Sequence, residues 1–404
     1  MTFRTTTIAE IANPAPRSIA IGPFGSSLKA DMYTSTGVPL VRGQNLTSAS
    51  EIDLSDVVYV APETASKFPA CMLEEGDLVF PHRGAIGRVG IVGETPALLS
   101  SSMMKLKCDR SKADPRFVFY YFRGPGRREL MMRASTVGTP GIGQPLTSLR
   151  EIPIQLPSIE EQRNIAGVLG SIDEKIAANI RLSAISEQLL ATEVQQRWLT
   201  QPSGSAVSIL TIFEVGRSLP APIGAEPVYL GMKNIPESGV GITNWEHRSA
   251  RGGARFTNGD TLLARITPCL ENGKTGYVDF LKSGEIGIGS TEFIVLRSRE
   301  GIPSALSYFL AIDSKFRDFA IRHMVGTSGR QRVSASSIST YMLPSPDKGW
   351  MNDFGARAAQ QFALMKSLRG ENRVLAALRD ALLPELMSGR LRVKDAEKQI
   401  EEVL

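Results

Sequence analysis

The chain has 404 residues, of which 42% are hydrophobic and 22% are charged, and its formal net charge is +5. These values are typical of a soluble protein of two to four domains, and the small positive charge permits contact with nucleic acid phosphates without demonstrating it. No apolar run reaches the ~18 residues of a membrane span, the first residues lack a signal-peptide core, and three scattered cysteines argue against disulfides and structural zinc. We therefore expect a cytoplasmic protein with no membrane contact and no bound metal.

The first segment, residues 1–157, contains short apolar runs separated by glycine turns, and these runs predict β-strands. They cover residues 38–41, 57–60, 78–80 and 89–92. A helical stretch follows near residues 115–132. The segment therefore reads as one mixed α/β unit.

Residues 158–200 predict one long helix. Ser158 and Glu161 form a capping-box start, and residues 201–204 form a stop signal with a proline and a glycine. At ~1.5 Å per residue, this helix would be on the order of 60 Å long. Its apolar residues recur at spacings of three and four, which is the pattern of a seam for another helix. The predicted seam residues are Ile165, Leu169, Ile172, Ile176, Asn179, Leu182 and Leu189.

The same order of features returns in the second half of the chain. Residues 75–79 are echoed by residues 258–262, and Tyr120 is echoed by Tyr308, 188 positions later. A second helix, at about residues 351–385, then carries its own seam. Its predicted seam residues are Met365, Leu368, Asn372, Leu375 and Leu382. The repeat predicts a tandem duplication of one mixed α/β unit followed by one long helix.

The two long helices are expected to pack on each other as an antiparallel coiled coil, in a protein of the α+β class. Asn179 and Asn372 stand at matching seam positions, 193 residues apart. A polar seam residue costs stability but fixes the register of the two helices. The alternative for each asparagine is a solvated position on its helix.

These residues resemble a known family. The stretch 156–166, with Glu160-Glu161-Gln162-Arg163 in it, closely resembles the central conserved region of type I restriction-modification specificity subunits. Further similarity to that family lies in residues 22–29, 38–45, 76–79, 172–182 and 383–393. The resemblance covers nearly the whole chain, and the order of its parts is more specific than any single motif. The second helix departs from the pattern, because residues 349–353 stand where a second Glu-Glu-Gln-Arg is expected.

The resemblance implies that residues 1–157 and 201–350 are target-recognition domains, each reading one half of a split sequence in double-stranded DNA. It implies that residues 158–200 and 351–404 are conserved spacer helices, the second with a C-terminal tail. The helices would set the gap between the half-sites and dock two modification (methyltransferase) subunits and a restriction (endonuclease/translocase) subunit. S-adenosylmethionine, ATP and Mg are then expected on the partner subunits and not on this chain.

The sequence contains no constellation that predicts catalysis. Gly273-Lys274-Thr275 ends like a phosphate loop, but Pro268 stands where the first glycine of that loop is required. Asp77 and Asp260 each follow a glycine at equivalent places in the two halves, which suits turn residues that begin a strand better than catalytic carboxylates. We therefore predict a non-catalytic protein with no catalytic residue of its own.

Reading DNA requires basic groups for phosphates and Arg, Lys, Asn or Gln side chains for base edges. Such residues gather in corresponding clusters in both halves of the chain. The candidate DNA-contacting residues of the first half are Lys29, Arg42, Gln44, Asn45, Arg83, Arg88, Thr139 and Gln144. Those of the second half are Lys233, Asn234, Arg265, Lys274, Arg330, Gln331 and Arg332. For any single residue, a solvated surface position is the alternative.

Two other classes of protein compete with a DNA-specificity subunit. A coiled-coil scaffold whose globular parts bind proteins would carry the same repeat and the same helices. A self-sufficient methyltransferase or nuclease has the sequence against it, since the Asn/Asp-Pro-Pro-Tyr/Phe motif of amino-methyltransferases does not occur.

Overall fold

The structure is a computed structural model that describes residues 3–23, 27–47, 51–135, 138–200, 205–216, 218–222, 226–249, 252–327 and 329–402. The chain forms two compact units. Unit 1 consists of Met1–Ala177 and Arg373–Leu404, and unit 2 consists of Ala178–Asn372. The predicted stop signal at residues 201–204 and part of the predicted motif at residues 22–29 lie outside the described residues.

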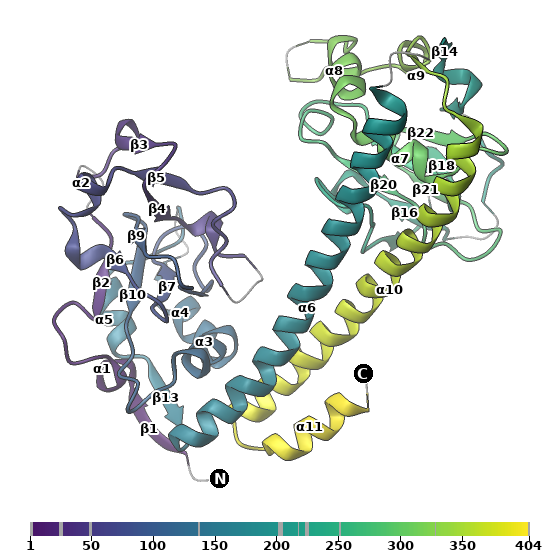
Figure 1. Ribbon diagram of the computed structural model, residues 1–404. Helices are drawn as coiled ribbons and strands as arrows, with labels where there is room; N and C mark the ends of the chain where they lie inside the picture. Colours follow the sequence, from purple (N-terminus) through teal and green to yellow (C-terminus); the bar gives the residue numbers. More distant parts are fainter. Residues whose placement is uncertain are drawn as a thin grey trace. The chain divides into compact units, whose positions relative to one another are not determined.

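Unit 1 is built on two sheets, with short helices around them (Figure 1). The first sheet is antiparallel, in the order β2 (Ile19–Ile21), β10 (Met103–Leu106), β7 (Leu78–Pro81), β8 (Gly90–Ile91). The second sheet has the order β3 (Tyr33–Thr34), β5 (Val58–Val60), β4 (Val38–Val41), β9 (Ala97–Leu99), β6 (Met72–Leu73). Only β4 and β9 pair in parallel there. Two further antiparallel pairs are β1 (Arg4–Thr7) with β13 (Pro153–Leu156), and β11 (Ala134–Ser135) with β12 (Gly141–Ile142).

The helical stretch predicted near residues 115–132 is confirmed. It consists of two helices, α3 (Pro115–Arg123) and α4 (Pro125–Met132). Gly124 ends the first helix, and Pro125 begins the second, because proline has no backbone N–H and fits the first turn of a helix better than its interior. The remaining short helices are α1 (Ile8–Ile11), α2 (Pro62–Ala65) and α5 (Pro145–Arg150).

Among the described residues, unit 2 repeats this topology without strands that correspond to β3 and to the β11–β12 pair. Its antiparallel sheet has the order β15 (Phe213–Val215), β22 (Phe293–Ser298), β19 (Thr261–Ala264), β20 (Thr275–Tyr277). Its second sheet has the order β17 (Glu246–His247), β16 (Val228–Leu230), β21 (Gly287–Gly289), β18 (Ala254–Phe256), again with one parallel pair, β16 with β21. The terminal pair is β14 (Ala206–Ser208) with β23 (Met342–Pro344), and the helices are α7 (Ala305–Ile312), α8 (Ser314–Arg322) and α9 (Ala335–Ile338). The predicted tandem duplication is confirmed.

The two aspartates that the sequence placed at equivalent turns have equivalent structural contacts. Asp77 Oδ2 accepts a hydrogen bond from the Glu74 N–H at 3.1 Å and lies 3.6 Å from Lys105 Nζ. Asp260 Oδ2 accepts from the Thr257 N–H at 2.7 Å and pairs with Arg297 at 2.6 Å. Burial raises the pKa of Asp77. Both carboxylates therefore close the turn before a central strand and neutralise a cation of the neighbouring strand.

The two long helices are α6 (Ile159–Val194), which a π-helical turn extends to Leu199, and α10 (Lys348–Met387). In unit 1, Asp173 Oδ1 of α6 pairs with Arg379 Nη1 of α10 at 2.6 Å. In unit 2, Asn179 Nδ2 donates to Asn372 Oδ1 at 2.9 Å, and Glu193 accepts from Trp350 Nε1 at 2.9 Å. As the residue numbers in α6 increase, those of their partners in α10 decrease, so the helices pack antiparallel, as predicted.

Most predicted seam residues are buried, but two are not. Ile165, Leu169, Ile172, Asn179, Met365, Leu368, Leu375 and Leu382 are buried, and Ile176 and Asn372 are half-buried. Leu182 and Leu189, by contrast, are 43% and 67% exposed, so their assignment to the seam is wrong. The buried row beyond Asn179 runs through Ser186, Leu190 and Val194. Leu189 lies one residue away from that row, about 100° around the helix.

The C-terminal tail of the second helix folds into a further helix, α11 (Val393–Glu401), which the sequence pattern did not predict. It begins after Gly389, whose φ of +71° suits the left-handed conformation that ends a helix. Ala396 is completely buried and belongs to the hydrophobic core of unit 1, so the tail packs on that unit. Within the described part of the chain, every helix is too short or too polar to cross a lipid bilayer.

Candidate nucleic-acid interface

Three loops that carry candidate residues meet in unit 1. They are the turn at residues 42–46, the β7–β8 loop at residues 82–88, and the loop before α5 at residues 138–144, and we call them the unit 1 loop cluster. The Gly84 N–H donates to the Pro140 carbonyl at 2.9 Å, and the Ile142 N–H donates to the His82 carbonyl at 3.0 Å. Backbone hydrogen bonds therefore hold two of the three predicted clusters side by side.

Unit 2 brings the corresponding loops together in the same way. Its loop cluster consists of residues 231–235, 265–274, 325–327 and 329–333. The Thr267 N–H donates to the Gln331 carbonyl at 3.1 Å, and the Val333 N–H donates to the Arg265 carbonyl at 2.9 Å. Gly326, at φ +139°, leaves no room for a Cβ, which would lie 2.7 Å from the Arg330 carbonyl oxygen. The tight turn that results presents Arg330 at the surface of the cluster.

A basic side chain ties the remaining loop to the cluster in each unit. Arg88 Nη1 donates to the Leu46 carbonyl at 3.1 Å. Lys274 Nζ donates to the carbonyls of Met232 and Ile235, both at 3.3 Å. We call Arg88 and Lys274 the carbonyl clamps, because each reaches from the start of an edge strand to the 3₁₀ turn that follows a central strand. All three predicted clusters of each unit thus form one surface.

Several candidate side chains are exposed at these surfaces. The exposed candidates are Lys29, Gln44, Arg83, Arg88, Thr139, Gln144, Lys233 and Arg330, and Lys233 lies in an ion pair with Glu246. Arg42 and Arg265 are half-buried, and the buried Nε of each has no hydrogen-bond partner among the described residues. A buried donor without a partner costs free energy unless a ligand or water satisfies it. The roles of these residues in DNA contact stay predictions.

The assignment of Asn45 and Asn234 to base contacts is corrected by the structure. Asn45 is buried, accepts from the Arg42 N–H at 2.9 Å and donates to the Asp53 carbonyl at 3.0 Å. Asn234 is buried and accepts from the Gly231 N–H at 2.8 Å. Each amide closes the 3₁₀ turn of its own loop cluster, so it fixes the shape of the turn and does not face a ligand.

Lys274 and Arg332 are also committed to contacts within unit 2. The ammonium of Lys274, with a side chain only 17% exposed, is held by two carbonyls and lies 3.8 Å from Glu237. Arg332 forms a bidentate pair with Glu292, with Nε to Oε2 at 2.9 Å and Nη2 to Oε1 at 2.8 Å. The guanidinium of Arg332 is therefore not free for a bidentate contact with guanine. Gln331, half-buried, uses its backbone N–H on Thr267 Oγ1 at 3.2 Å.

His82 lies in the unit 1 loop cluster, and Glu292 pairs with Arg332 of the unit 2 loop cluster; no sequence pattern selected either residue. Burial lowers the pKa of His82, so its imidazole is neutral, and Nε2 lies 3.0 Å from the Ser101 carbonyl oxygen, to which it donates. The Arg332 guanidinium lowers the pKa of the Glu292 carboxyl and keeps it ionised. Neither the solitary histidine nor the solitary glutamate carries a recognisable signal in the sequence. No group of three or more His, Cys, Asp or Glu side chains in the described ranges is arranged to hold a metal ion.

The Glu-Glu-Gln-Arg motif has one buried member, Gln162, which is 1% exposed. Its Oε1 accepts from the Asp114 N–H at 2.9 Å, and its Nε2 donates to the carbonyls of Lys112 and Pro157 at 3.2 and 3.0 Å. Asp114 in turn caps α3 through the N–H groups of Arg116 and Phe117. Gln162 therefore joins the first turn of α6 to the first turn of α3.

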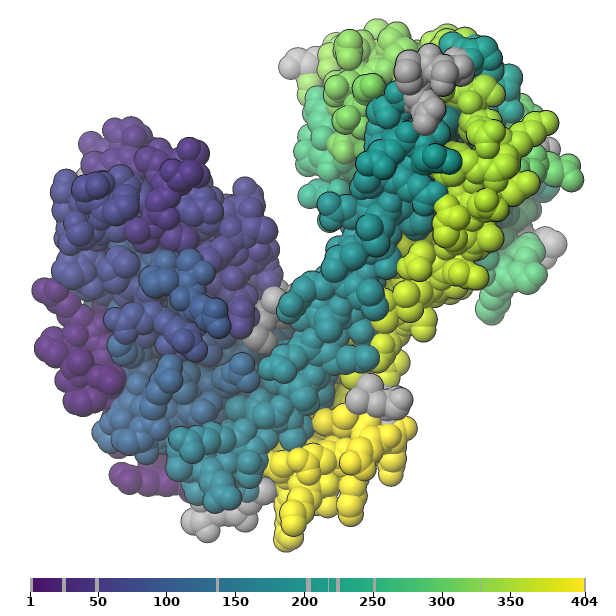
Figure 2. All heavy atoms as spheres, viewed as in Figure 1, coloured from purple at the N-terminus to yellow at the C-terminus, as the bar shows by residue number. Residues whose placement is uncertain are grey.

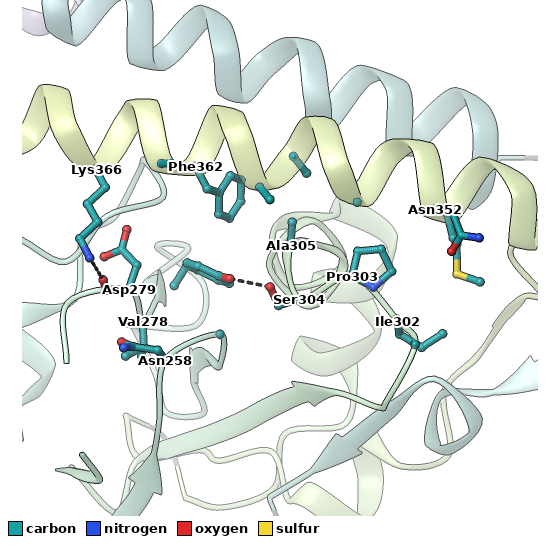
Figure 3. Close-up of a pocket in the computed structure, with 18 residues that line it drawn as sticks. Asn258, Val278, Asp279, Ile302, Pro303, Ser304, Ala305, Asn352, Phe362 and Lys366 are labelled. Carbon is teal, nitrogen blue, oxygen red and sulfur yellow. Dashed lines mark hydrogen bonds between the residues drawn. The ribbon is translucent and has the colours of Figure 1, made fainter. Parts of the chain in front are cut away.

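The position that corresponds to Gln162 in unit 2 is Gly355, beside Pro303. Here α10 borders a cavity of about 590 Å³ (Figure 3). Figure 3 shows Pro303, Ser304 and Ala305 at the start of α7 facing α10, and Lys366 donating to the Asp279 carbonyl. The loss of the motif in the second repeat thus leaves a hollow where unit 1 has a buried amide.

One face of α6 in unit 2 carries apolar side chains that the fold leaves uncovered. Ile180, Leu182, Ile185 and Leu189 are all exposed. Leu182, Ile185 and Leu189, at spacings of three and four, lie on one side of the helix, whereas Ile180, two residues before Leu182, lies on the opposite side. We call Leu182, Ile185 and Leu189 the α6 stripe. Figure 2 shows that α6 has a solvent-facing surface along this part of the chain.

The duplicated α/β unit, with its repeated loop cluster and its long antiparallel helices, defines a class of proteins that carry a similar loop surface in each of two units. The family described as "Type I restriction modification DNA specificity domain" matches residues 28–185 of this chain.

Relatives of known name agree with this family. The chain is 35% identical over 97 residues to the type I restriction enzyme EcoEI specificity subunit of Escherichia coli, a match that covers 24% of this chain and 16% of the relative. It is 29% identical over 163 residues to the type I restriction enzyme MjaVIII specificity subunit of Methanocaldococcus jannaschii, covering 38% and 37% of the two chains. The chain thus matches each of these relatives over less than half of the relative's length. The solved structure of a type I restriction-modification S subunit from M. genitalium has a TM-score of 0.57, covers 96% of both chains and is 15% identical, so it supports the fold.

Proposed function

We propose that this chain is the non-catalytic DNA-specificity subunit of a type I restriction-modification complex. The observation that carries the proposal is the recurrence, in both units, of a loop cluster with the same backbone pairing and the same carbonyl clamp. Each cluster would read one half of a bipartite target. The family match over residues 28–185 supports this assignment.

The mechanism follows from the chemistry of the free side chains. Phosphate contacts by exposed arginines would give salt-dependent affinity, and a few base contacts per unit, worth ~1 to 3 kcal/mol each, would give sequence choice. Gln44 and Arg83 in unit 1 and Arg330 in unit 2 are exposed and carry the groups that such contacts need. Neither unit alone would discriminate strongly.

A salt titration of duplex binding by the full chain tests this function. A DNA reader loses affinity as salt rises, with a slope of log K against log salt of about −0.9 for each phosphate contact. A coiled-coil scaffold, the competing function, binds a protein and is indifferent to duplex DNA at any salt concentration. Methyl transfer by this chain alone would contradict the non-catalytic assignment.

The catalytic work would then belong to partners. We propose two modification subunits and one restriction subunit as partners, which would carry S-adenosylmethionine, ATP and Mg. The α6 stripe supports docking on the helices, since contiguous exposed apolar residues mark protein interaction sites. It lies in the first of the two long helices, the one that begins with Glu160-Glu161-Gln162-Arg163.

Replacing Leu182 and Leu189 together with serine should weaken capture of the modification subunit at least tenfold. The replacements remove exposed apolar surface that only a partner buries, so melting temperature and DNA preference should not change. Pull-down of the co-expressed subunit measures the effect. Met342→Ser, at another exposed apolar residue of unit 2, is the matched control. Undiminished capture by the double variant would contradict docking at this stripe.

The helices would also set the gap between the half-sites. The 36 residues of α6 span about 54 Å at ~1.5 Å per residue. Deleting one heptad from each long helix keeps the seam in register and should shorten the gap by roughly three base pairs, at ~3.4 Å per base pair. Selection of bound duplexes by the deletion variant measures the gap. Changed half-sites, with the gap unaltered, would contradict the spacer role.

A further inference from the structure

Unit 1 contains a groove that the proposed function does not use. It has a volume of about 740 Å³ and lies among β1, α1, the end of α5 and the residues that lead into α6. Figure 1 shows α1, α5, β1 and β13 grouped at one end of unit 1. Its lining contains four cations, Arg4, Arg17, Lys112 and Arg150, and one carboxylate, Glu10.

The positive charge of this groove is mostly unneutralised. Arg4, Arg17 and Arg150 are exposed, and within the described ranges none of their side chains has a hydrogen bond or an ion pair. Lys112 is partly engaged, because its Nζ donates to the Glu10 carbonyl at 3.2 Å and lies 3.4 Å from Asp109. The carboxylate of Glu10 accepts a hydrogen bond from the Thr6 hydroxyl. Three arginines therefore face the groove with all their donors available.

The basic groove is not part of the duplication. The pairing of β1 with β13 and of β14 with β23 places Ser205 at the position of Arg4 and Ser339 at the position of Arg150. Unit 2 thus lacks two of the arginines at the corresponding place. A feature present in one repeat only is not required for the fold that both repeats share.

We propose that this groove binds the phosphodiester backbone of DNA that flanks the half-site read by unit 1. Guanidinium groups bind phosphate oxygens through two parallel hydrogen bonds, which suits three free arginines. Helix α5 connects the groove to the reading surface, since Gln144 of the loop cluster precedes the helix and Arg150 ends it. Six helical residues span about 9 Å, or fewer than three base pairs of duplex.

The inference rests on the proposed function for one point only, namely the sequence of the duplex that is used as the probe. Its test compares the full wild-type chain with the variant Arg4→Gln/Arg17→Gln/Arg150→Gln. The probes are the selected duplex with long flanks and the same duplex trimmed at the end of the unit 1 half-site. Because all three residues are exposed, the variant should fold normally, as its melting temperature checks.

On the long duplex, the slope of log K against log salt should fall by about one for each phosphate that the groove no longer neutralises, up to about three. On the trimmed duplex, variant and wild type should bind alike, and the selected sequence should not change. The control variant Lys282→Gln/Lys315→Gln/Arg322→Gln removes the same charge from exposed sites of unit 2. It should leave the difference in salt slope between the long and the trimmed duplex as it is in the wild type.

Equal salt slopes for the variant and the wild type on the long duplex would overturn the inference. An equal loss of salt slope on the long and the trimmed duplex would also overturn it. So would a variant that no longer captures the modification subunit but binds DNA as the wild type does, because the groove would then be a protein-binding site. If the wild-type chain shows no sequence preference but the triple variant still loses slope, the proposed function fails while the groove remains a phosphate site.

Discussion

Arg88→Met should reduce the discrimination of unit 1 for its half-site by roughly tenfold to a hundredfold, the equivalent of one good base contact. Methionine keeps much of the length of the side chain but cannot donate to the Leu46 carbonyl, now held at 3.1 Å. Without this clamp, the turn at residues 42–46 is tied to the loop cluster less firmly. Gln44, exposed on that turn, then no longer has one fixed position from which to read a base.

Lys274→Met should have the same effect on unit 2. Lys274 holds the turn at residues 231–235 through two carbonyls at 3.3 Å, so its removal leaves both carbonyls without that donor. Lys274 is therefore a positioning residue, because its ammonium is occupied inside the unit.

Each clamp variant is the internal control for the other. Binding of duplexes with single-base changes in either half-site measures the discrimination of each unit separately. Arg88→Met should relax the first half only, and Lys274→Met the second half only, with the salt slope changing by at most about one. Equal relaxation of both halves by one variant, or none by either, would contradict the positioning role.

Gln162→Met should destabilise the chain by about 2 to 5 kcal/mol, the cost of leaving several buried backbone groups without partners. Methionine fills the same space but cannot satisfy the Asp114 N–H or the carbonyls of Lys112 and Pro157. For a unit of this size, the melting temperature should fall on the order of 10 °C. Thermal unfolding followed by circular dichroism measures the change.

Arg163→Met is the matched control, because Arg163 is the exposed neighbour of Gln162 in the same motif and should melt like the wild type. Gln162→Glu keeps the acceptor for the Asp114 N–H and loses both donors, so it should also be destabilised. A melting temperature of Gln162→Met within one or two degrees of that of Arg163→Met would show that the buried amide does not join α6 to α3.

Much of the architecture was predictable because it depends on local patterns and on the repeat. The apolar runs at 38–41 and 78–80 form central strands, the seam spacing predicted that the two long helices pack together, and the connectivity of the chain predicted that they are antiparallel. The prediction of the seam was wrong beyond Asn179, where the small polar residue Ser186 lies in the buried row and the exposed leucines Leu182 and Leu189 lie beside it. A rule that follows hydrophobicity selects Leu189 there, although the geometry of the helix pair selects Leu190.

The candidate interface was predictable as a set of loops but not residue by residue. An asparagine near a turn reads the same in the sequence whether it faces DNA or closes the turn, and Asn45 and Asn234 close their turns. The ion pair that occupies the guanidinium of Arg332 depends on Glu292, which lies 40 residues earlier in the chain. Such long-range pairs follow from strand order and register, which the repeat suggested in outline only. The helix α11 was missed although Val393, Ala396 and Ile400 recur in it at spacings of three and four and pack on the core of unit 1.

The central claim is that the two units read separate half-sites of one DNA sequence. Selection of bound duplexes from a random pool, by the chain in complex with its co-encoded partners, tests it most directly. We predict two specified half-sites separated by a gap of fixed length in which no base is preferred. Recovery of one continuous motif, or of two half-sites at variable spacing, would contradict the claim.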